Sequence, residues 1–353
     1  MVQTPNKQLT HLKNIPNGYP VVGEHIDVKE STIDLEAPLE EGAILLKIHI
    51  ISADPFMRSP MKGNDSGSFF PPYLIGQPVY GVTVSSVVKS NNAKFNKDDL
   101  VVGITNIEEY TVIGPSNPFF NWLEIRNETK TSGLPLSYAV SVLGMPGQTA
   151  YHGLLQVGKP KEGETLYVSA ASGAVGQLVG QIGKQRGLKV VGSAGSDEKV
   201  AYLKEIGFDE AFNYKKTSSI TNTLKELCPN GIDIYFDNVG GEHLEAAIEN
   251  ANRFARFPLC GMVSTYNTKE AVGIRNLMSL MPKHITLEGF GVSDYFQFND
   301  QFTEEVTGWL KEGKIQYRET IAGSIDEAAQ AVVDIFHGKN FGKQSIYVSD
   351  PSF

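Results

Sequence analysis

Cysteine is scarce in this 353-residue chain, which has only Cys228 and Cys260. Two thiols cannot build a disulfide framework or a thiolate zinc site, so we interpret both as packing residues in a reducing compartment. The seven histidines are scattered without metal-ligand spacing, and no G-x-S-x-G nucleophile elbow occurs. The sequence therefore predicts no metal site, and a Ser-His-Asp triad stays open on composition alone.

Clusters of positive charge and long apolar runs are also lacking. The net charge is -9 and no basic cluster stands out, which argues against a nucleic-acid partner. The first twenty residues are polar and contain proline, without the apolar segment of a secretion signal. No run approaches the ~18 apolar residues of a spanning helix. We therefore expect a cytoplasmic protein with no membrane contact.

The first third of the chain is dominated by short β-prone runs. The length exceeds what one hydrophobic core usually supports, so two domains are expected. Clusters of Pro, Gly, Asn and Asp separate the runs, a spacing typical of a small barrel or sandwich. The predicted strands cover residues 21–22 with 25–28, 43–52, 79–89, 100–104 and 109–113.

From about residue 135 the pattern changes to alternating strands and helices. Helical patterns at 136–143 and 149–156 open this part. Alternation predicts a parallel sheet with right-handed crossovers, covered on both faces. The tail either caps that sheet or rejoins the first domain. Predicted strands cover 165–169, 189–192, 211–214, 232–236, 254–260, 285–290, 315–320 and 344–348, and predicted helices cover 174–186, 196–206, 218–227, 242–250, 299–312 and 325–336.

One stretch, residues 165–176, combines a buried strand, a turn of small residues and a helix start. Amides at a helix N-terminus lack internal partners, and the helix dipole favours an anion there. The spacing Ala170-x-x-Gly173-x-x-Gly176 is a relative of the dinucleotide fingerprint, with Ala in place of the first Gly. The alternative is close packing of a helix on a sheet. The predicted cofactor-binding residues here are Ala170, Ser172, Gly173, Ala174, Val175 and Gly176.

The end of the next strand indicates which dinucleotide is bound. Small residues occupy the position where an Asp or Glu usually binds the adenosine ribose. Gly195, Ser196 and Lys199 could instead accept a 2′-phosphate, so the sequence predicts NADPH rather than NADH. The alternative is that Lys199 is an ordinary solvated helix residue. Asp197 and Glu198 argue mildly against NADPH unless they cap the helix and point away.

Several further motifs carry a family resemblance over nearly the whole chain. The chain resembles the zinc-independent medium-chain dehydrogenase/reductases, in the group of prostaglandin reductases, plant alkenal double-bond reductases and bacterial curcumin reductases. The combination of motifs is specific, although each motif alone is not. The motifs are Asp54-Pro55-Phe56-Met57-Arg58, Gly147-Gln148-Thr149-Ala150-Tyr151, Phe236-Asp237-Asn238-Val239-Gly240-Gly241, Cys260 to Asn267, Glu288-Gly289-Phe290 and Asn340-Phe341-Gly342-Lys343.

The resemblance implies an α/β fold in which a Rossmann doubly wound parallel sheet is inserted in a GroES-like β-barrel domain. The GroES-like substrate domain would comprise residues 1–130 and 314–353, and the NADPH-binding domain residues 131–313. The resemblance also implies a homodimer. The implied reaction is NADPH-dependent reduction of the C=C bond of α,β-unsaturated aldehydes and ketones without a metal. The alternatives are a quinone reductase or allylic alcohol dehydrogenase on the same scaffold, and a non-catalytic NADPH-binding protein.

The resemblance also implies roles for individual residues. Tyr266 is the candidate hydrogen-bond donor and a cofactor contact, and Tyr80 is a second candidate near the substrate. For either tyrosine the alternative is a purely structural role. Phe56 replaces the Tyr usual in the family, so any role of that hydroxyl is lost. Tyr214, Asn238, Cys260 and Asn340 are further candidate cofactor contacts, and Phe56, Met57, Arg58, Phe69, Tyr80, Phe290 and Tyr295 are candidate substrate-pocket residues.

Overall fold

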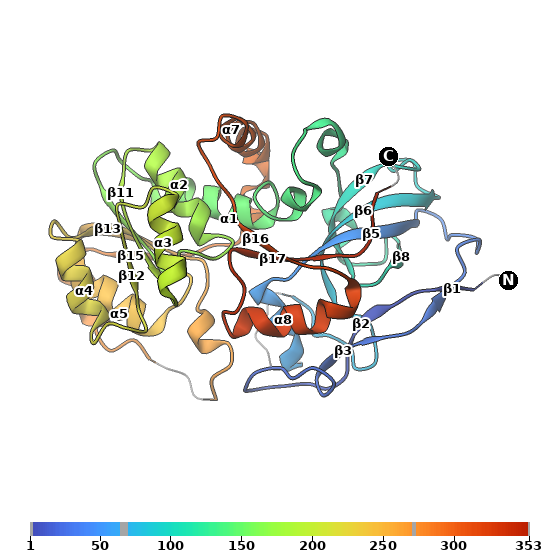
Figure 1. The fold of residues 1–353 in the computed structure, drawn as a ribbon, viewed down its shortest axis with the longest axis horizontal. Coiled ribbons are helices and arrows are strands. Elements are labelled where there is room, and N and C mark those ends of the chain that lie inside the picture. Colours follow the sequence, from blue (N-terminus) through green and yellow to red (C-terminus); the bar gives the residue numbers. More distant parts are fainter. Residues whose placement is uncertain (1–2, 64–69, 270–272, 352–353) are drawn as a thin grey trace. The chain divides into compact units, whose positions relative to one another are not determined.

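The computed structural model describes residues 3–63, 70–269 and 273–351 (Figure 1). The chain divides into two compact units, which we call the β-rich unit (Met1–Ser141 with Glu319–Phe353) and the parallel-sheet unit (Val142–Arg318). Both boundaries lie later in the chain than residues 130/131 and 313/314. The first lies later because the 3-10 helix η5 (Leu136–Val140) packs on strands β5 and β6 of the β-rich unit.

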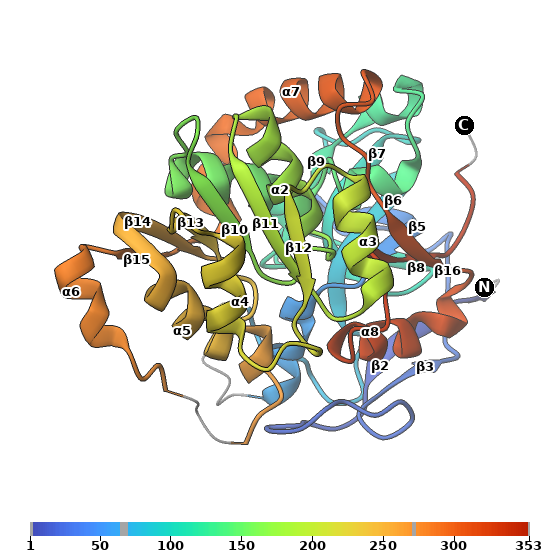
Figure 2. The same ribbon diagram turned by 60° about the vertical axis from the view of Figure 1, so that its left-hand side comes forward.

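The parallel-sheet unit contains six strands in the order β12-β11-β10-β13-β14-β15, all parallel (Figure 2). The chain adds strands towards one edge from β10 to β12 and towards the other edge from β13 to β15, so the strand order switches between β10 and β13. Ligands of doubly wound sheets bind outside the carboxyl ends of the strands at such a switch point. This confirms the predicted doubly wound sheet. The strands are β10 Thr165–Val168, β11 Lys189–Ala194, β12 Glu210–Asn213, β13 Ile232–Phe236, β14 Ala251–Leu259 and β15 Thr286–Gly289.

Helices cover both faces of this sheet because the strands are apolar on both sides. On one face Tyr167, Val191 and Tyr235 form a core with Leu224 of α4 and Leu244 of α5. On the other face helix α2 packs so closely that a Cβ on Gly183 would lie 2.8 Å from Leu166. The main helices are α1 Met145–His152, α2 Gly176–Gln185, α3 Asp197–Glu205, α4 Ile220–Leu227, α5 Gly241–Asn250, α6 Leu280–Lys283 and α7 Asn299–Lys311.

Some predicted elements differ from the observed ones. Residues 136–140 form a 3-10 helix, and α1 is followed by the π-helix η6 (Gly153–Gly158). Helix α2 begins at Gly176, not at residue 174, because the turn after β10 extends two residues further. Residues 315–318 are not a strand of either sheet, and strand β16 (Glu319–Ala322) begins only afterwards.

Residues 316–318 lie against helix α2 and are held there by two buried glutamines. The Gln177 amide donates to the Arg318 carbonyl (3.1 Å) and accepts from the Arg318 amide (2.9 Å). Gln181, one turn later, makes the same pair of bonds to Gln316 at 2.7 and 2.8 Å. These side-chain amides replace a neighbouring strand, so the segment stays in the parallel-sheet unit until Arg318.

The β-rich unit is built on a seven-stranded sheet (Figure 1). This sheet combines strands from the first part of the chain with two strands of the C-terminal tail. Its path is β16-β17-β5-β6-β7-β9, with β8 also paired to β5. Strand β17 is antiparallel to β5, so the tail rejoins the first domain. The sheet strands are β5 Ile44–Ser52, β6 Tyr80–Ser90, β7 Leu100–Asn106, β8 Tyr110–Ile113, β9 Glu124–Ile125, β16 Glu319–Ala322 and β17 Lys343–Tyr347.

Two short strand pairs and one helix complete this unit. Helix α8 (Ala328–Phe336) places Ala328, Val332 and Phe336 in a core with Leu9 and Met57. The pairs are β1 Thr4–Pro5 with β4 Thr32–Ile33, and β2 Gln8–His11 with β3 Ile26–Lys29. Within the described residues, no helix combines the length and apolar character needed to cross a bilayer.

Each unit contains a fully enclosed histidine that should make the protein sensitive to acid. His49 lies between Ser86 and Ser349, at 2.9 Å from each hydroxyl, and His243 lies 2.6 Å from the Tyr167 hydroxyl. Burial lowers the pKa of both imidazoles from 6.5 to about 4. The unfolded state therefore binds more protons between these values, and stability is lost as the pH falls from about 6.5 towards 4.

We expect the melting temperature to fall steeply between pH 6.5 and 4.5. A shift of this size corresponds to about 3 kcal/mol for each histidine. Thermal unfolding followed across this range would show a shallower loss in His49→Asn, which no longer titrates at that position. His337→Gln, at an exposed histidine, is the control and should keep the wild-type slope. Equal slopes in all three proteins would contradict this assignment.

Candidate active site

The turn between β10 and α2 has the geometry of a phosphate cradle. Ala170 adopts a left-handed conformation (φ 46°), and its carbonyl accepts from the Gly173 amide at 3.0 Å. The Ala171 amide bonds to the Ser193 carbonyl, which ties the turn to the end of β11. The loop leads directly into the first turn of α2, where backbone amides and the helix dipole attract an anion. Ser172, Ala174 and Val175 complete the turn.

Gly176 is the position in this turn that a side chain would disrupt most. A Cβ there would lie 2.5 Å from the Ala170 carbonyl oxygen and 2.7 Å from the Ala171 Cα. Gly173 is less restricted, since its nearest atom would be the Ala170 oxygen at 3.2 Å. Both clashes at Gly176 involve backbone, so the turn itself would have to move.

Gly176→Ala should therefore weaken dinucleotide binding more than Gly173→Ala. Overpacking of this kind costs about 1–3 kcal/mol and shifts the backbone that forms the cradle. Titration of each variant with the reduced cofactor, followed by nicotinamide fluorescence, gives the two dissociation constants. Equal affinities in the two variants would contradict the close backbone approach at Gly176.

After β11, the two acidic residues at the start of α3 are engaged by other side chains. Ser196 caps the helix and accepts from the Lys199 amide (3.3 Å). Asp197 accepts from Asn213 and pairs with Lys216, and Glu198 lies 3.7 Å from Arg318. Ser196, and neither carboxylate, caps the helix, and both carboxylates are paired with other groups.

A second lysine that sequence reasoning did not single out lies beside this turn. A Cβ on Gly195 would lie 3.3 Å from the Tyr214 hydroxyl and 3.4 Å from the Lys215 Cε. The pKa of Lys199 is lowered, first by burial and then by the charge of Lys215. Two cations thus converge on the Gly195–Ser196 turn. The adjacent lysines after β12 were the signal in the sequence, because that strand end neighbours the end of β11.

The ends of β13 and β14 form a second rigid loop pair. The buried Asp237 carboxylate accepts from the amides of Val239 (2.9 Å) and Gly240 (2.7 Å) and from the Tyr235 hydroxyl (2.7 Å). Asn238 donates to the Ser169 carbonyl at 2.8 Å, so it is tied to the end of β10. Burial raises the pKa of Asp237. These bonds fix the loop beside the point between β10 and β13 where the strand order switches.

Tyr266 and Cys260 lie together in this loop region. The Cys260 amide donates to the Asp237 carbonyl (2.9 Å), and its half-buried thiol has a pKa raised to about 12 by burial. The Tyr266 hydroxyl would lie 2.9 Å from a Cβ on Gly261, so the phenol approaches the backbone closely at that glycine. The pKa of Tyr266 is raised, first by burial and then by Cys260. The phenol is therefore neutral and able to donate a hydrogen bond at physiological pH.

Phe290 and Tyr295 form an aromatic group in the same unit. Phe290 lies 6.1 Å from Phe236 and 6.5 Å from Tyr295, and Tyr295 stacks on His152 at 5.9 Å between ring centroids. Both side chains are half-buried. They follow β15 and thus lie on the carboxyl side of the sheet, as a pocket wall requires.

In the β-rich unit, the Tyr80 hydroxyl is engaged with the backbone. It donates to the Pro71 carbonyl, and burial raises its pKa. Its ring packs against Tyr73 (4.7 Å) and Phe119 (4.8 Å). Tyr80 also borders a hollow of about 280 Å³ lined by Tyr73, Thr105, Asn106 and Phe119 among others. The Tyr80 hydroxyl thus makes a hydrogen bond of the kind expected if Tyr80 has a purely structural role.

The other candidates in this unit differ in exposure. Phe56 is half-buried and lies 4.7 Å from Phe70. Met57 and Arg58 are wholly enclosed, Met57 in the apolar core and Arg58 donating to the Gly18 carbonyl (2.9 Å). Burial lowers the pKa of Arg58 to about 10. These two side chains therefore lie beneath the surface of the β-rich unit.

Two candidates remain. Asn340 is half-buried and donates to the Gly342 carbonyl at 2.7 Å, in the turn before β17. Phe69 lies outside the described residues. Among the residues that are described, no three His, Cys, Asp or Glu side chains are grouped so that they could hold a metal ion.

Comparison with known proteins places the chain in a family. A family model described as "Zinc-binding dehydrogenase" matches residues 174–312, and one described as "N-terminal domain of oxidoreductase" matches residues 8–119. The chain is 44% identical to the NADP(+)-dependent 2-alkenal reductase of Nicotiana tabacum over 98% of both chains. It is 43% identical to the (+)-pulegone reductase of Mentha piperita, also over 98% of both chains.

A solved structure is similar to this chain over nearly its whole length. The crystal structure of CurA from Vibrio vulnificus in complex with NADPH is similar, with a TM-score of 0.86, 37% identity and coverage of 98% of this chain and 100% of that one. The fold and the strand-end loops define an oxidoreductase of the medium-chain dehydrogenase/reductase type. Within that superfamily, the chain belongs to the group that contains the alkenal, pulegone and curcumin reductases.

Proposed function

We propose that this protein uses NADPH to reduce the C=C bond of α,β-unsaturated aldehydes and ketones. The observation that carries the proposal is the pair Lys199 and Lys215 at the Gly195–Ser196 turn, with Asp197 engaged elsewhere. This arrangement suits a 2′-phosphate and lacks the carboxylate that NADH-binding sites use. The related tobacco and peppermint proteins are named for an alkenal and an enone.

The residues present fit the cofactor. The turn from Ala170 to Gly176 would hold the pyrophosphate at the start of α2, and no side chain fits at Gly176. Asn238 and Cys260 lie on the rigid loops at the strand ends, where the nicotinamide half of a dinucleotide is expected. When bound, NADPH supplies the hydride that the β-carbon of the substrate receives.

The chain's own contribution is to stabilise charge on the substrate. Negative charge develops on the carbonyl oxygen as the β-carbon is reduced, and a fixed hydrogen-bond donor there lowers the barrier. Tyr266 is the donor we assign, because its neutral phenol is held on the loop after β14. A proton then reaches the α-carbon from a donor or from water. Since the Tyr80 proton is held by the Pro71 carbonyl, Tyr80 shapes the aromatic wall in this scheme.

The exposed edge of the parallel sheet and the cysteine content bear on association and location. We propose a homodimer through β15, the edge strand of the parallel sheet, whose residues Thr286, Glu288 and Gly289 are exposed. Large apolar side chains gather in the neighbouring segments, as an interface between two copies would require. These side chains are Phe254, Leu277, Met278 and Met281. The scarcity of cysteine supports a reducing compartment, and we propose the cytoplasm.

Product analysis separates the proposal from its alternatives. Incubation with NADPH and a 2-alkenal should give the saturated aldehyde. An allylic alcohol as product would instead indicate C=O reduction, and turnover with quinones alone would indicate a quinone reductase. NADPH binding without turnover on a broad enone panel would support a non-catalytic role and contradict the proposal.

A further inference from the structure

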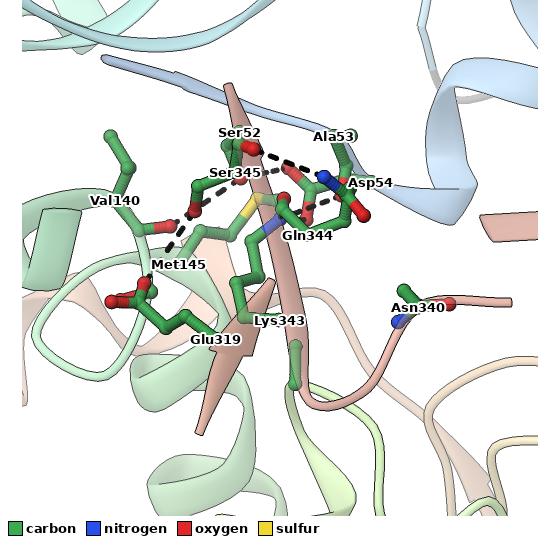
Figure 3. A network of polar contacts seen from close by, with 12 residues as sticks. Ser52, Ala53, Asp54, Val140, Met145, Glu319, Asn340, Lys343, Gln344 and Ser345 are labelled. Atoms are coloured by element: carbon green, nitrogen blue, oxygen red, sulfur yellow. Dashed lines mark hydrogen bonds and ion pairs between the residues drawn. The ribbon is translucent and has the colours of Figure 1, made fainter. Parts of the chain in front are cut away.

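Two chain segments 290 residues apart meet at a buried lysine in the β-rich unit (Figure 3). The Lys343 side chain, at the start of β17, is 1% exposed. Its ammonium donates to the carbonyls of Ala53 (2.6 Å) and Gln344 (2.7 Å), and lies 3.2 Å from the Asp54 carboxylate. An ammonium has three N–H donors, and these three contacts account for all of them.

The Asp54 carboxylate, which pairs with Lys343, is also buried and hydrogen-bonded. The Asp54 side chain is 6% exposed, and its second oxygen accepts from the Ser52 hydroxyl at 2.5 Å. That hydroxyl also lies 3.4 Å from the Val140 carbonyl. Burial lowers the pKa of Lys343, and Asp54 acts in the opposite direction. Both ions are thus enclosed, paired and hydrogen-bonded, the condition under which buried charges are tolerated.

Each residue of this ion pair is next in sequence to a segment that carries a proposed site residue. The Asp54 carbonyl accepts from the Met57 amide (3.1 Å), which starts the 3-10 helix η1 (Pro55–Arg58) with Phe56 on it. Lys343 directly follows the tight turn that carries Asn340, in which Gly342 adopts φ 71°. The pair therefore fixes where the chain leaves the sheet at both segments.

Stability alone does not account for the pair. Backbone pairing from Ser345 to Tyr347 already fastens β17 to β5, and the Ala53 amide adds a bond to the Gln344 carbonyl (3.1 Å). A buried ion pair contributes little net stability compared with apolar residues of the same volume. The ion pair does fix the orientation of the two side chains, because each donor must point at a fixed acceptor. Its distinctive contribution is the placement of the two segments.

We propose that Lys343 and Asp54 are positioning residues that hold Asn340 for the cofactor and the Pro55–Arg58 turn for the substrate. The inference rests on the proposed function, since it takes NADPH as the cofactor and Asn340 as one of its contacts. Neither side chain touches a reacting atom in this account. Their loss should therefore raise the Kd for NADPH and the KM for the enone more than it lowers kcat.

The test compares Lys343→Met, Asp54→Asn and the double variant. Lys343→Met leaves an unpaired buried carboxylate, so its melting temperature should fall furthest, and the double variant should recover much of that loss. The Kd for NADPH, read from nicotinamide fluorescence, should stay about tenfold above wild type in the double variant. Asp54→Asn keeps both carbonyl bonds of Lys343 and should show a smaller rise. If the variants at Lys343 do not fold, the rise in Asp54→Asn decides the question.

Asn6→Ala is the matched control. Asn6 is buried in the same unit and bonds to Glu108 (3.1 Å) and to the backbone of Tyr110 (3.0 and 2.8 Å), remote in sequence from both segments. It should lower the melting temperature and leave the Kd unchanged. The proposal is overturned if Asn6→Ala raises the Kd as much for the same loss of stability, or if affinity returns to the wild-type value in the double variant.

Failure of the proposed function gives a different result. If the wild-type protein binds NADPH but turns over no enone, the assigned reaction is contradicted. The Kd values of the variants would still decide whether Lys343 and Asp54 position Asn340. If the wild-type protein reduces enones and all three variants keep the wild-type Kd, only the positioning role is contradicted.

Discussion

Replacement of Tyr266 by Phe should lower kcat for an enone by about 100-fold or more, the usual effect of removing one donor to a developing oxyanion. The phenol carries its proton at neutral pH, and burial raises its pKa further above the ordinary value. A hydrogen bond that strengthens as charge develops acts on kcat rather than on ground-state binding. The Kd for NADPH should therefore change far less than kcat.

Stopped-flow measurement of nicotinamide oxidation at saturating NADPH isolates this step. Tyr347→Phe also removes a single hydroxyl, on a strand of the β-rich unit, and should retain the wild-type rate. A Tyr266→Phe rate within a few-fold of wild type would show that the phenol is only packed in its loop. Water or another donor would then stabilise the oxyanion.

Removal of both lysines at the Gly195–Ser196 turn should abolish the preference for NADPH over NADH. Charge-assisted hydrogen bonds contribute about 1.5–3 kcal/mol each, so the double variant Lys199→Ala/Lys215→Ala should lose about 100-fold or more in kcat/KM for NADPH. The rate with NADH should hardly change, because NADH has no 2′-phosphate for these side chains to bind. The ratio of kcat/KM for the two cofactors is the quantity to measure.

Lys216→Ala is the control for this prediction. Lys216 is adjacent to Lys215 and is paired with Asp197, so it should contribute little to phosphate binding. Its loss also releases Asp197, which should weaken NADPH binding slightly by repulsion. Equal losses with NADPH and NADH in the double variant would mean that the two lysines support the fold and not the phosphate.

The alternating part of the fold could be predicted closely because its strands are buried on both faces. Strand β13 was predicted at its observed bounds, 232–236, where four of the five residues are apolar and only Asp233 is charged. Strands β1, β2 and β4 were missed, since they are two to four residues long and partly polar. Residues 315–318 were predicted as part of a strand, but their backbone bonds to two glutamine side chains of α2 and not to a neighbouring strand.

The candidate site was predictable where neighbouring residues in sequence form it. The turn from Ala170 to Gly176 is a local structure, and its spacing revealed it. Lys215 was missed because its proximity to Gly195 depends on the pairing of β11 with β12. The pair Lys343 and Asp54 depends on contacts between segments about 290 residues apart, and a lone lysine after glycine carries no signal of that partner.

Hydride transfer from NADPH to a conjugated C=C bond can be followed by isotope labelling. The protein is incubated with a 2-alkenal and NADPH carrying deuterium at the transferred position, and the product is examined by mass spectrometry and NMR. We expect the saturated aldehyde with deuterium at the β-carbon. Deuterium on the carbonyl carbon of an allylic alcohol, or no product with any enone, would contradict it.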